Sequence, residues 1–84
     1  MDSFMITFSS VTPAQSGEAT LRRAGFTCSL QRTPRWMEVK GCGYSVRLRA
    51  ERVEDAIRLL RDRNVRFRKI YKLEKDGTIT EVAV

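Results

Sequence analysis

The 84-residue sequence contains no histidine, which disfavours several kinds of chemistry at once. Histidine is the usual general base near neutral pH and the commonest zinc ligand. Its absence also excludes a Cys–His pair, a common arrangement for activating a nucleophilic thiol. With only 2 cysteines, one chain cannot supply the usual four-ligand zinc set, although a dimer would have four. We therefore expect no cofactor and no metal.

Long apolar runs are also missing, and none approaches the roughly 20 residues that cross a bilayer. The opening Met1-Asp2 is acidic and leads directly into an alternating strand pattern, unlike a signal peptide. Two cysteines are weak evidence for a disulfide framework. The sequence therefore predicts a cytoplasmic protein that does not associate with membranes.

Basic residues exceed acidic ones, with 16 Lys and Arg against 10 Asp and Glu and a net charge of +6. Such a surface attracts polyanions such as RNA or acidic proteins, but it also keeps a small protein soluble. The apolar content of 42% is ordinary for a folded protein. A chain of this length predicts a single domain over residues 1–84 with a thin core.

The hydrophobic periodicity alternates between strand and helix. Apolar residues at every second position predict strands, and apolar stripes at three- and four-residue spacing predict helices. Thr12 is expected to cap the first helix with Pro13 at its first position, and Asn64 to stop the second. The expected strands cover 3–8, 26–31, 44–49 and 65–73, and the expected helices cover 12–24 and 53–63.

Small residues and turn residues add detail to this pattern. Gly17 lies on the narrow stripe of the first helix, which predicts close approach to a sheet, and Gly25 is expected to end that helix. The apolar phase changes near Ile70, which predicts either a bulge or an edge position. Asp76-Gly77 is typical of a two-residue hairpin loop, and Thr78 to Val84 would then pair as a fifth strand.

This order predicts an α+β fold, the ferredoxin-like split βαβ (βαββαβ) sandwich. Both helices would cover one face of an antiparallel sheet, with the first and third strands as central neighbours. The core would span 3–73, and 74–84 would add a C-terminal hairpin strand. That tail has two alternatives: it frays, or its edge pairs with a second copy to form a homodimer.

The two cysteines have different surroundings in the sequence. Cys28 shares a strand face with Phe26 and Leu30, which predicts core packing, with a role as resolving partner for Cys42 as the alternative. Cys42 lies between Gly41 and Gly43, whose lack of side chains leaves its sulfur reachable. The alternative for Cys42 is a small residue in a tight turn.

Basic residues near Cys42 would favour its thiolate, which is the nucleophilic form. We hypothesise that Arg35 and Arg47 lie close to the sulfur, with solvated surface charges as the alternative. The amides beside Gly41 and Gly43 would form a small anion nest. Helix termini are not expected to contribute, because Cys42 precedes a strand.

The residues Thr33-Pro34-Arg35, Cys42-Gly43 and Arg47 resemble the motif of the selenium/sulfur carrier-like family, and the resemblance extends to about Leu73. It implies that Cys42 carries sulfur or selenium, as a persulfide or selenide, and passes it to a partner enzyme. The partners would be sulfur- or selenium-donating and accepting proteins. The chain would be a carrier, and an enzyme only if it catalyses the transfer itself.

A nucleic-acid-binding module is the main alternative function. The expected open face of the sheet has no aromatic residue to stack bases, so we expect only weak, non-specific RNA binding. Trp36 and Tyr44 are the aromatic residues near the loop that keep this alternative open. A ligand-binding module with a structural cysteine is the third alternative. The expected open-face positions are Met5, Thr7, Ser45, Arg47 and Arg49.

Overall fold

The computed structural model describes residues 3–32, 43–49 and 53–82, which form five strands and two helices. The fold is α+β. Its elements are, in chain order, β1 (Ser3–Phe8), α1 (Val11–Arg23), β2 (Cys28–Arg32), β3 (Tyr44–Arg49), α2 (Val53–Asp62), β4 (Ile70–Leu73) and β5 (Ile79–Val82). Among the described residues, neither helix is long and apolar enough to cross a membrane.

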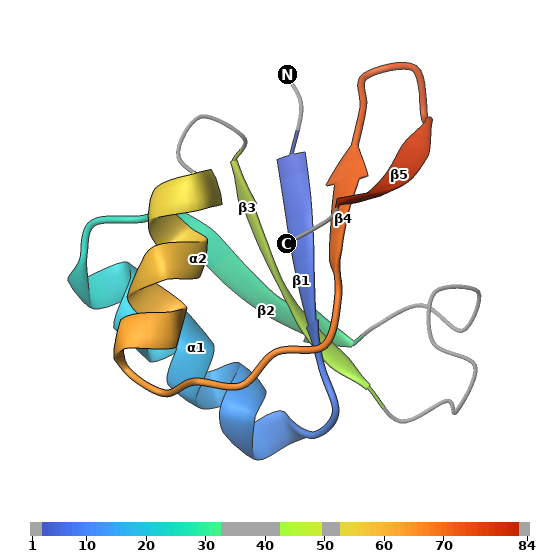
Figure 1. Ribbon diagram of the computed structural model, residues 1–84. Helices are drawn as coiled ribbons and strands as arrows, with labels where there is room; N and C mark the ends of the chain where they lie inside the picture. The colour runs from blue at the N-terminus through green and yellow to red at the C-terminus, as the bar shows by residue number, and fades with distance from the viewer. Residues whose placement is uncertain (1–2, 33–42, 50–52, 83–84) are drawn as a thin grey trace.

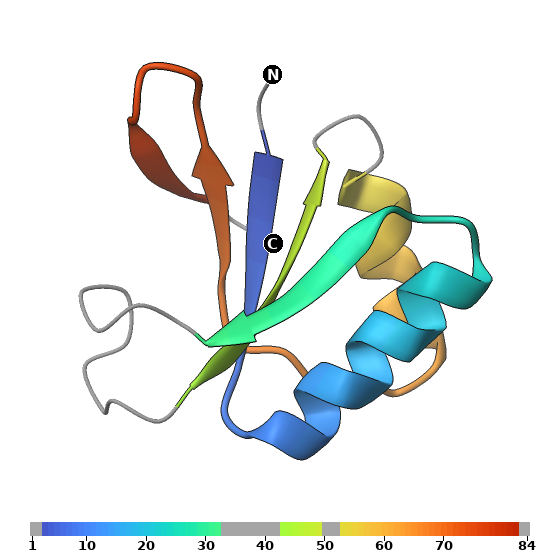
Figure 2. The same cartoon turned by 180° about the vertical axis from the view of Figure 1, so that it is seen from behind.

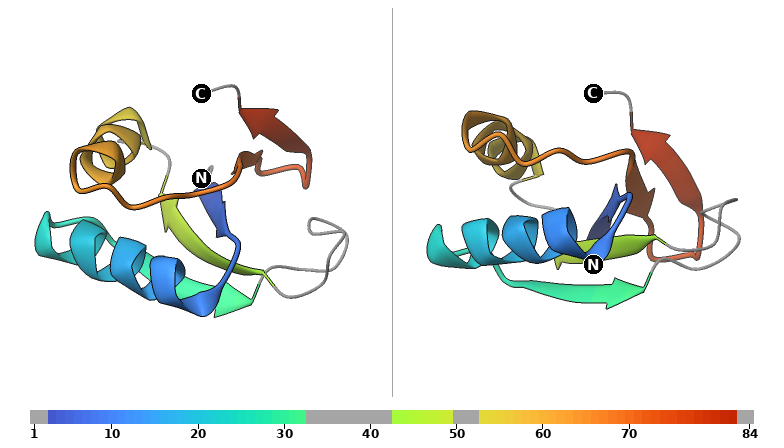
Figure 3. Two further views of the ribbon diagram at one scale, coloured as in Figure 1. Left: turned by 60° about the horizontal axis from the view of Figure 1, so that its bottom comes forward. Right: turned by 90° about the horizontal axis from the view of Figure 1, so that it is seen from below.

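The strands form one antiparallel sheet in the order β2-β3-β1-β4-β5. The first strand is central and pairs with β3 on one side and β4 on the other, as the sequence predicted for β1 and β3. Both helices lie on the same side of the curved sheet, and β5 forms its far edge (Figures 1 and 3). The expected fifth strand on β4 is therefore confirmed.

The core lies between the helices and the face of the sheet that carries Phe4, Ile6 and Phe8. Gly17 of α1 packs against Phe8, and a Cβ at residue 17 would lie 2.8 Å from the Cζ atom of that ring. Since carbon atoms do not approach so closely, only glycine allows this helix–sheet distance without a shift. The predicted close approach of α1 to the sheet is confirmed.

The start of α1 differs from the prediction. Its N-cap is Ser10 and not Thr12, which lies within the first turn together with Pro13. Proline is tolerated there because the first four N–H groups of a helix have no partner within the helix. Both Ser10 and Thr12 are good capping residues, so residue preference alone did not distinguish them.

Both helices end as the sequence predicted, on residues with left-handed backbone. Gly25 has a φ of 91° and Asn64 a φ of 57°. The amide two residues beyond the C-cap then donates to a carbonyl of the last turn, from Phe26 to Leu21 at 3.0 Å. In α2 the equivalent bond has a length of 2.9 Å, and this pattern satisfies carbonyl groups that the helix leaves unpaired.

The fourth strand is shorter than predicted because a bulge precedes it. The Thr7 amide donates to the Lys69 carbonyl at 2.8 Å, while the Arg68 amide donates to the Thr7 carbonyl at 2.7 Å. Arg68 and Lys69 are therefore both opposite Thr7, and two residues opposite one define a β-bulge. The predicted bulge is confirmed, and the alternative of an edge position is wrong because β5 lies outside β4.

The bulge also decides which side chains of β4 share the open face. Tyr71 is directly opposite Met5, and residues opposite each other in a ladder point to the same side of the sheet. The sheet face away from the helices, called the open face below, therefore includes an aromatic residue, contrary to the expectation that it has none. Three positions expected to be exposed on this face, Met5, Thr7 and Ser45, are buried. The shifted phase of β4 hid Tyr71 from the sequence pattern.

The hairpin between β4 and β5 has a three-residue loop, not the predicted two-residue one. The Gly77 amide donates to the Glu74 carbonyl at 3.0 Å, and the Glu74 amide donates to the Thr78 carbonyl at 2.9 Å. Gly77 has a φ of 90° and no other loop residue has positive φ, whereas the two-residue type I′ turn needs two. Asp76 supports the loop by accepting a hydrogen bond from the Thr78 amide.

Candidate functional site

The segment with the predicted carrier cysteine connects two neighbouring strands. Residues 33–42, including Arg35, Gly41 and Cys42, lie outside the described residues. The structure does place both ends of the connection, because Arg32 at the end of β2 is opposite Tyr44 at the start of β3. Figure 2 shows these two strand ends meeting at one end of the sheet.

The described residues at this end of the sheet are basic, aromatic and apolar. The Arg32 guanidinium lies 6.0 Å from the centre of the Tyr44 ring, within range of a cation–π contact. On the neighbouring strand β1, Phe8 is opposite Tyr44. Gly43, one of the predicted site residues, is buried. Arg32 and the Tyr44 ring therefore flank the segment 33–42 at the base of the connection between β2 and β3. The sequence analysis did not single out Arg32.

The start of α1 lies at the same end of the sheet (Figure 1). The helix begins at Val11, only three residues after Phe8, and has no acidic residue in its first turn. Its free N–H groups carry partial positive charge. The expectation that no helix terminus contributes at Cys42 stays a prediction, because Cys42 lies outside the described residues. The route through β1 does bring the start of α1 to this end of the sheet.

Arg47 lies on the open face, as alternation predicted, and its side chain is exposed. It is three residues from Tyr44, or about 10 Å along the strand. Its Nε donates a hydrogen bond to the Ser3 hydroxyl at 3.3 Å, and Ser3 faces Arg49 farther from the loop. The proximity of Arg47 to Cys42 stays a prediction.

Cys28 is part of the core, which confirms its predicted packing role. The residue is 8% exposed and belongs to the central hydrophobic cluster. Burial raises the pKa of its thiol, the Arg22 side chain opposes this, and the nearby Glu18 carboxylate adds to it. A thiol kept neutral in this way is a poor nucleophile.

A charged side chain of α1 closes the outer edge of β2 beside Cys28. The Glu18 carboxylate accepts a hydrogen bond from the Leu30 amide at 2.7 Å and forms an ion pair with Arg22 at 3.6 Å. Arg22 in turn donates to the Cys28 carbonyl at 3.3 Å. The sequence signal for this network is the Glu–Arg pair at i,i+4, but its contact with β2 depends on tertiary packing.

Within the described ranges, no group of three or more Cys, Asp or Glu side chains could hold a metal ion. The described candidates for chemistry are therefore the residues at the base of the connection and the arginines of β3.

The comparisons with known proteins identify the family. The family described as "Putative Se/S carrier protein-like" matches residues 3–72, which include β1 to β3, both helices and most of β4. No curated protein and no solved structure matches the chain. The match covers far more than half of the sequence and leaves out β5. The chain therefore belongs to the Se/S carrier protein-like family.

Proposed function

We propose that the protein carries sulfur or selenium as a persulfide or selenide on Cys42 and passes it to a partner enzyme. The observation that supports this most directly is the burial of the other cysteine. Cys28 is 8% exposed, with a raised pKa, so Cys42 is the better candidate for a carrier thiol. Membership of the carrier family supports the choice of cargo.

The proposed transfer needs only thiol chemistry. The Cys42 thiolate attacks the outer sulfur of a persulfide on the donor protein and forms a new S–S bond. The S–S bond within the donor breaks, and the donor cysteine leaves as a thiolate. In the second step the acceptor takes the outer sulfur and Cys42 is released as a thiolate. The chain turns nothing over alone, so we propose a carrier and not an enzyme.

The proposed site surrounds the start of β3. Cys42 directly precedes Gly43 in the sequence, and the strand that follows begins at Tyr44, which is opposite Arg32. We propose that Arg35 and the backbone at Gly41 and Gly43 stabilise the anionic cargo. Arg47 fits a role in receiving the partner, since its guanidinium is directed toward Ser3.

The wider setting is proposed on the same basis. The strand order β2-β3-β1-β4, with two helices on one side, supports a ferredoxin-like core over 3–73, and 74–84 would extend it within a single domain. A carrier thiol must stay reduced, which the cytoplasm favours. Donor and acceptor proteins that handle sulfur or selenium would be its partners.

The test is an intact-protein mass measurement after incubation with a cysteine desulfurase and cysteine. The parent protein should gain the mass of one sulfur atom, which a reducing agent removes. Cys28→Ala, the matched control, should gain it equally, and Cys42→Ser should not. Equal loading of Cys42→Ser would refute the proposal.

A further inference from the structure

A hollow of about 400 Å³ lies at the end of the β2–β3 ladder away from the loop. Its polar lining combines two arginines of β3 with hydroxyl groups from the strands on both sides. Cys28 and Leu48 complete the lining, although their side chains are buried in the core. The polar lining residues are Ser3, Thr27, Ser29, Arg47 and Arg49. The proposed carrier function uses Arg47 at one side of the hollow to receive a partner, but assigns no ligand to the hollow itself.

The register explains why these groups converge. Arg47 and Arg49 are two residues apart on one strand, so both point to the open face. Arg47 is opposite Ser29 of β2, and Arg49 is opposite Ser3 of β1. The hydrogen bond from Arg47 to Ser3 runs diagonally, between the Arg47–Ser29 pair and the Arg49–Ser3 pair. Two guanidinium groups are thus flanked by hydroxyl groups on neighbouring strands.

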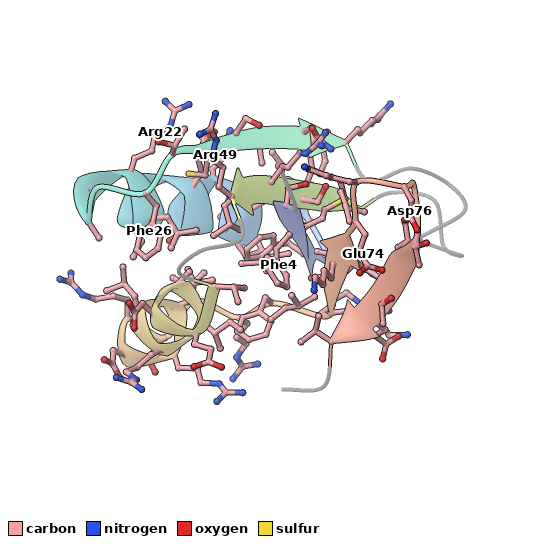
Figure 4. All side chains as sticks on the ribbon, turned by 90° about the horizontal axis from the view of Figure 1, so that it is seen from above. Phe4, Arg22, Phe26, Arg49, Glu74 and Asp76 are labelled. Atoms are coloured by element: carbon pink, nitrogen blue, oxygen red, sulfur yellow. The ribbon has the colours of Figure 1, made fainter. Side chains whose placement is uncertain are left out.

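The charge of the hollow has one sign. Among the residues that the structure describes, no carboxylate lines it. A third arginine, Arg22, reaches the adjacent Cys28 carbonyl, although Glu18 partly neutralises it. Figure 4 shows Arg22, from α1, and Arg49, from β3, on the β2 side of the molecule, away from α2. An anion entering here would meet positive charge and hydroxyl donors.

We propose that this hollow binds a phosphate group. Guanidinium groups match phosphate oxygens in pairs of parallel hydrogen bonds, and a tetrahedral phosphate has enough oxygens for two arginines and a hydroxyl. A flat carboxylate has only two oxygens, both of which a single guanidinium fork already engages, so phosphate is the better match for two forks. The phosphate comes either from a small phosphorylated molecule or from the backbone of a single-stranded RNA.

The experiment follows backbone amide shifts by NMR while inorganic phosphate is added at constant ionic strength. We expect saturable shifts at Ser3, Ser29 and Arg49, and affinity about tenfold weaker in Arg49→Gln. Arg58→Gln removes an exposed charge of α2 outside the hollow and is the matched control, with unchanged affinity. Unsaturable shifts, or equal losses in both variants, would overturn the proposal.

A second arm distinguishes the two sources of phosphate. Tyr71 continues the row of Arg47 across Met5 and offers a ring for base stacking. If a short RNA binds more tightly than inorganic phosphate and Tyr71→Leu weakens only the RNA, the source is nucleic acid. If RNA binds no more tightly, the source is a small molecule. Arg49→Gln must weaken either ligand, and its failure to do so contradicts the site.

Discussion

The two ends of the β2–β3 ladder differ in what they can do. At one end Cys28 is buried next to Leu48, while arginines and hydroxyl groups line the hollow on the open face. At the other end the Arg32 guanidinium lies over the Tyr44 ring. The segment with the second cysteine follows β2 and precedes β3 at this end. One ladder therefore keeps a neutral thiol in the core at one end, with arginines on the opposite face, and places Arg32 on an aromatic ring at the other end.

The difference separates two roles that the sequence assigned to one place. The sequence associates Arg47 with Cys42 because Arg47 lies on the strand that follows the loop, and their proximity stays a prediction. The hydrogen bond of Arg47 to Ser3 also links it to the end that contains the hollow. Arg32 is ten residues from Cys42 in the sequence, but it stands at the base of the connection.

The largest expected contrast is in thiol reactivity. Limiting iodoacetamide applied to the native protein should label Cys42 faster than Cys28, by on the order of a hundredfold, because a buried neutral thiol reacts only when the structure opens. Peptide mass mapping over time measures both rates. In denaturant the two rates should converge. Faster native labelling of Cys28 would show that the two ends are assigned the wrong way round.

The second prediction concerns the hydrogen bond of Glu18 at the outer edge of β2. Glu18→Ala should lower the free energy of unfolding by about 1–2 kcal/mol, because the Leu30 amide loses a charged acceptor. Chemical denaturation measures this loss. Glu18→Gln, which keeps an acceptor, should lose less. If Glu18→Ala is as stable as the parent, water replaces the carboxylate and the edge of β2 needs no cover.

The third prediction compares arginines at the two ends. Arg32→Gln should slow alkylation of Cys42 at neutral pH by roughly two- to threefold, because a nearby cation favours the thiolate. Arg47→Gln should have a smaller effect, and Arg35→Gln tests the loop itself. The pH dependence of the alkylation rate separates a change in thiol pKa from a change in access. A larger effect of Arg47→Gln would place that side chain at the loop after all.

The smallest effect is a pH dependence of stability from Cys28. Burial raises the pKa of its thiol above the ordinary value of 9.0, so at high pH the folded state holds a proton that the unfolded state has lost. Stability should therefore fall as the pH rises above 9.0 toward the folded-state pKa. Thermal unfolding across this range measures the slope, and Cys28→Ala should flatten it. An identical slope in both proteins would mean that the thiol ionises equally in both states.

Local sequence features predicted the parts of the fold that depend on local backbone chemistry. Alternation of apolar and polar residues predicted β1 and β3. Gly25 and Asn64 predicted the ends of the helices, because few residue types tolerate positive φ. Alternation also identified Cys28 as a core residue. Each of these features depends on the chain within a few residues.

Some features that the sequence did not predict depend on contacts between distant segments. Others depend on a local sequence that suits two conformations equally well. Glu18 caps the edge of β2 only because α1 packs beside that strand, and Tyr71 faces the open side only because a bulge shifts β4. Asp76-Gly77 suits both a two-residue and a three-residue hairpin loop. For the candidate site, the sequence singled out Cys42 but missed Arg32, whose position follows from the β2–β3 register.

The central place of β1 has a consequence for the order of synthesis. The strand β1 leaves the ribosome before β3 and β4, with which it pairs, and the Thr7–Lys69 hydrogen bonds span 62 residues. At typical translation rates that interval lasts on the order of several seconds. During it Phe4, Ile6 and Phe8 have no completed sheet or helix layer to enter. The nascent chain therefore passes through a stage in which its most apolar strand must be shielded by collapse or by a chaperone.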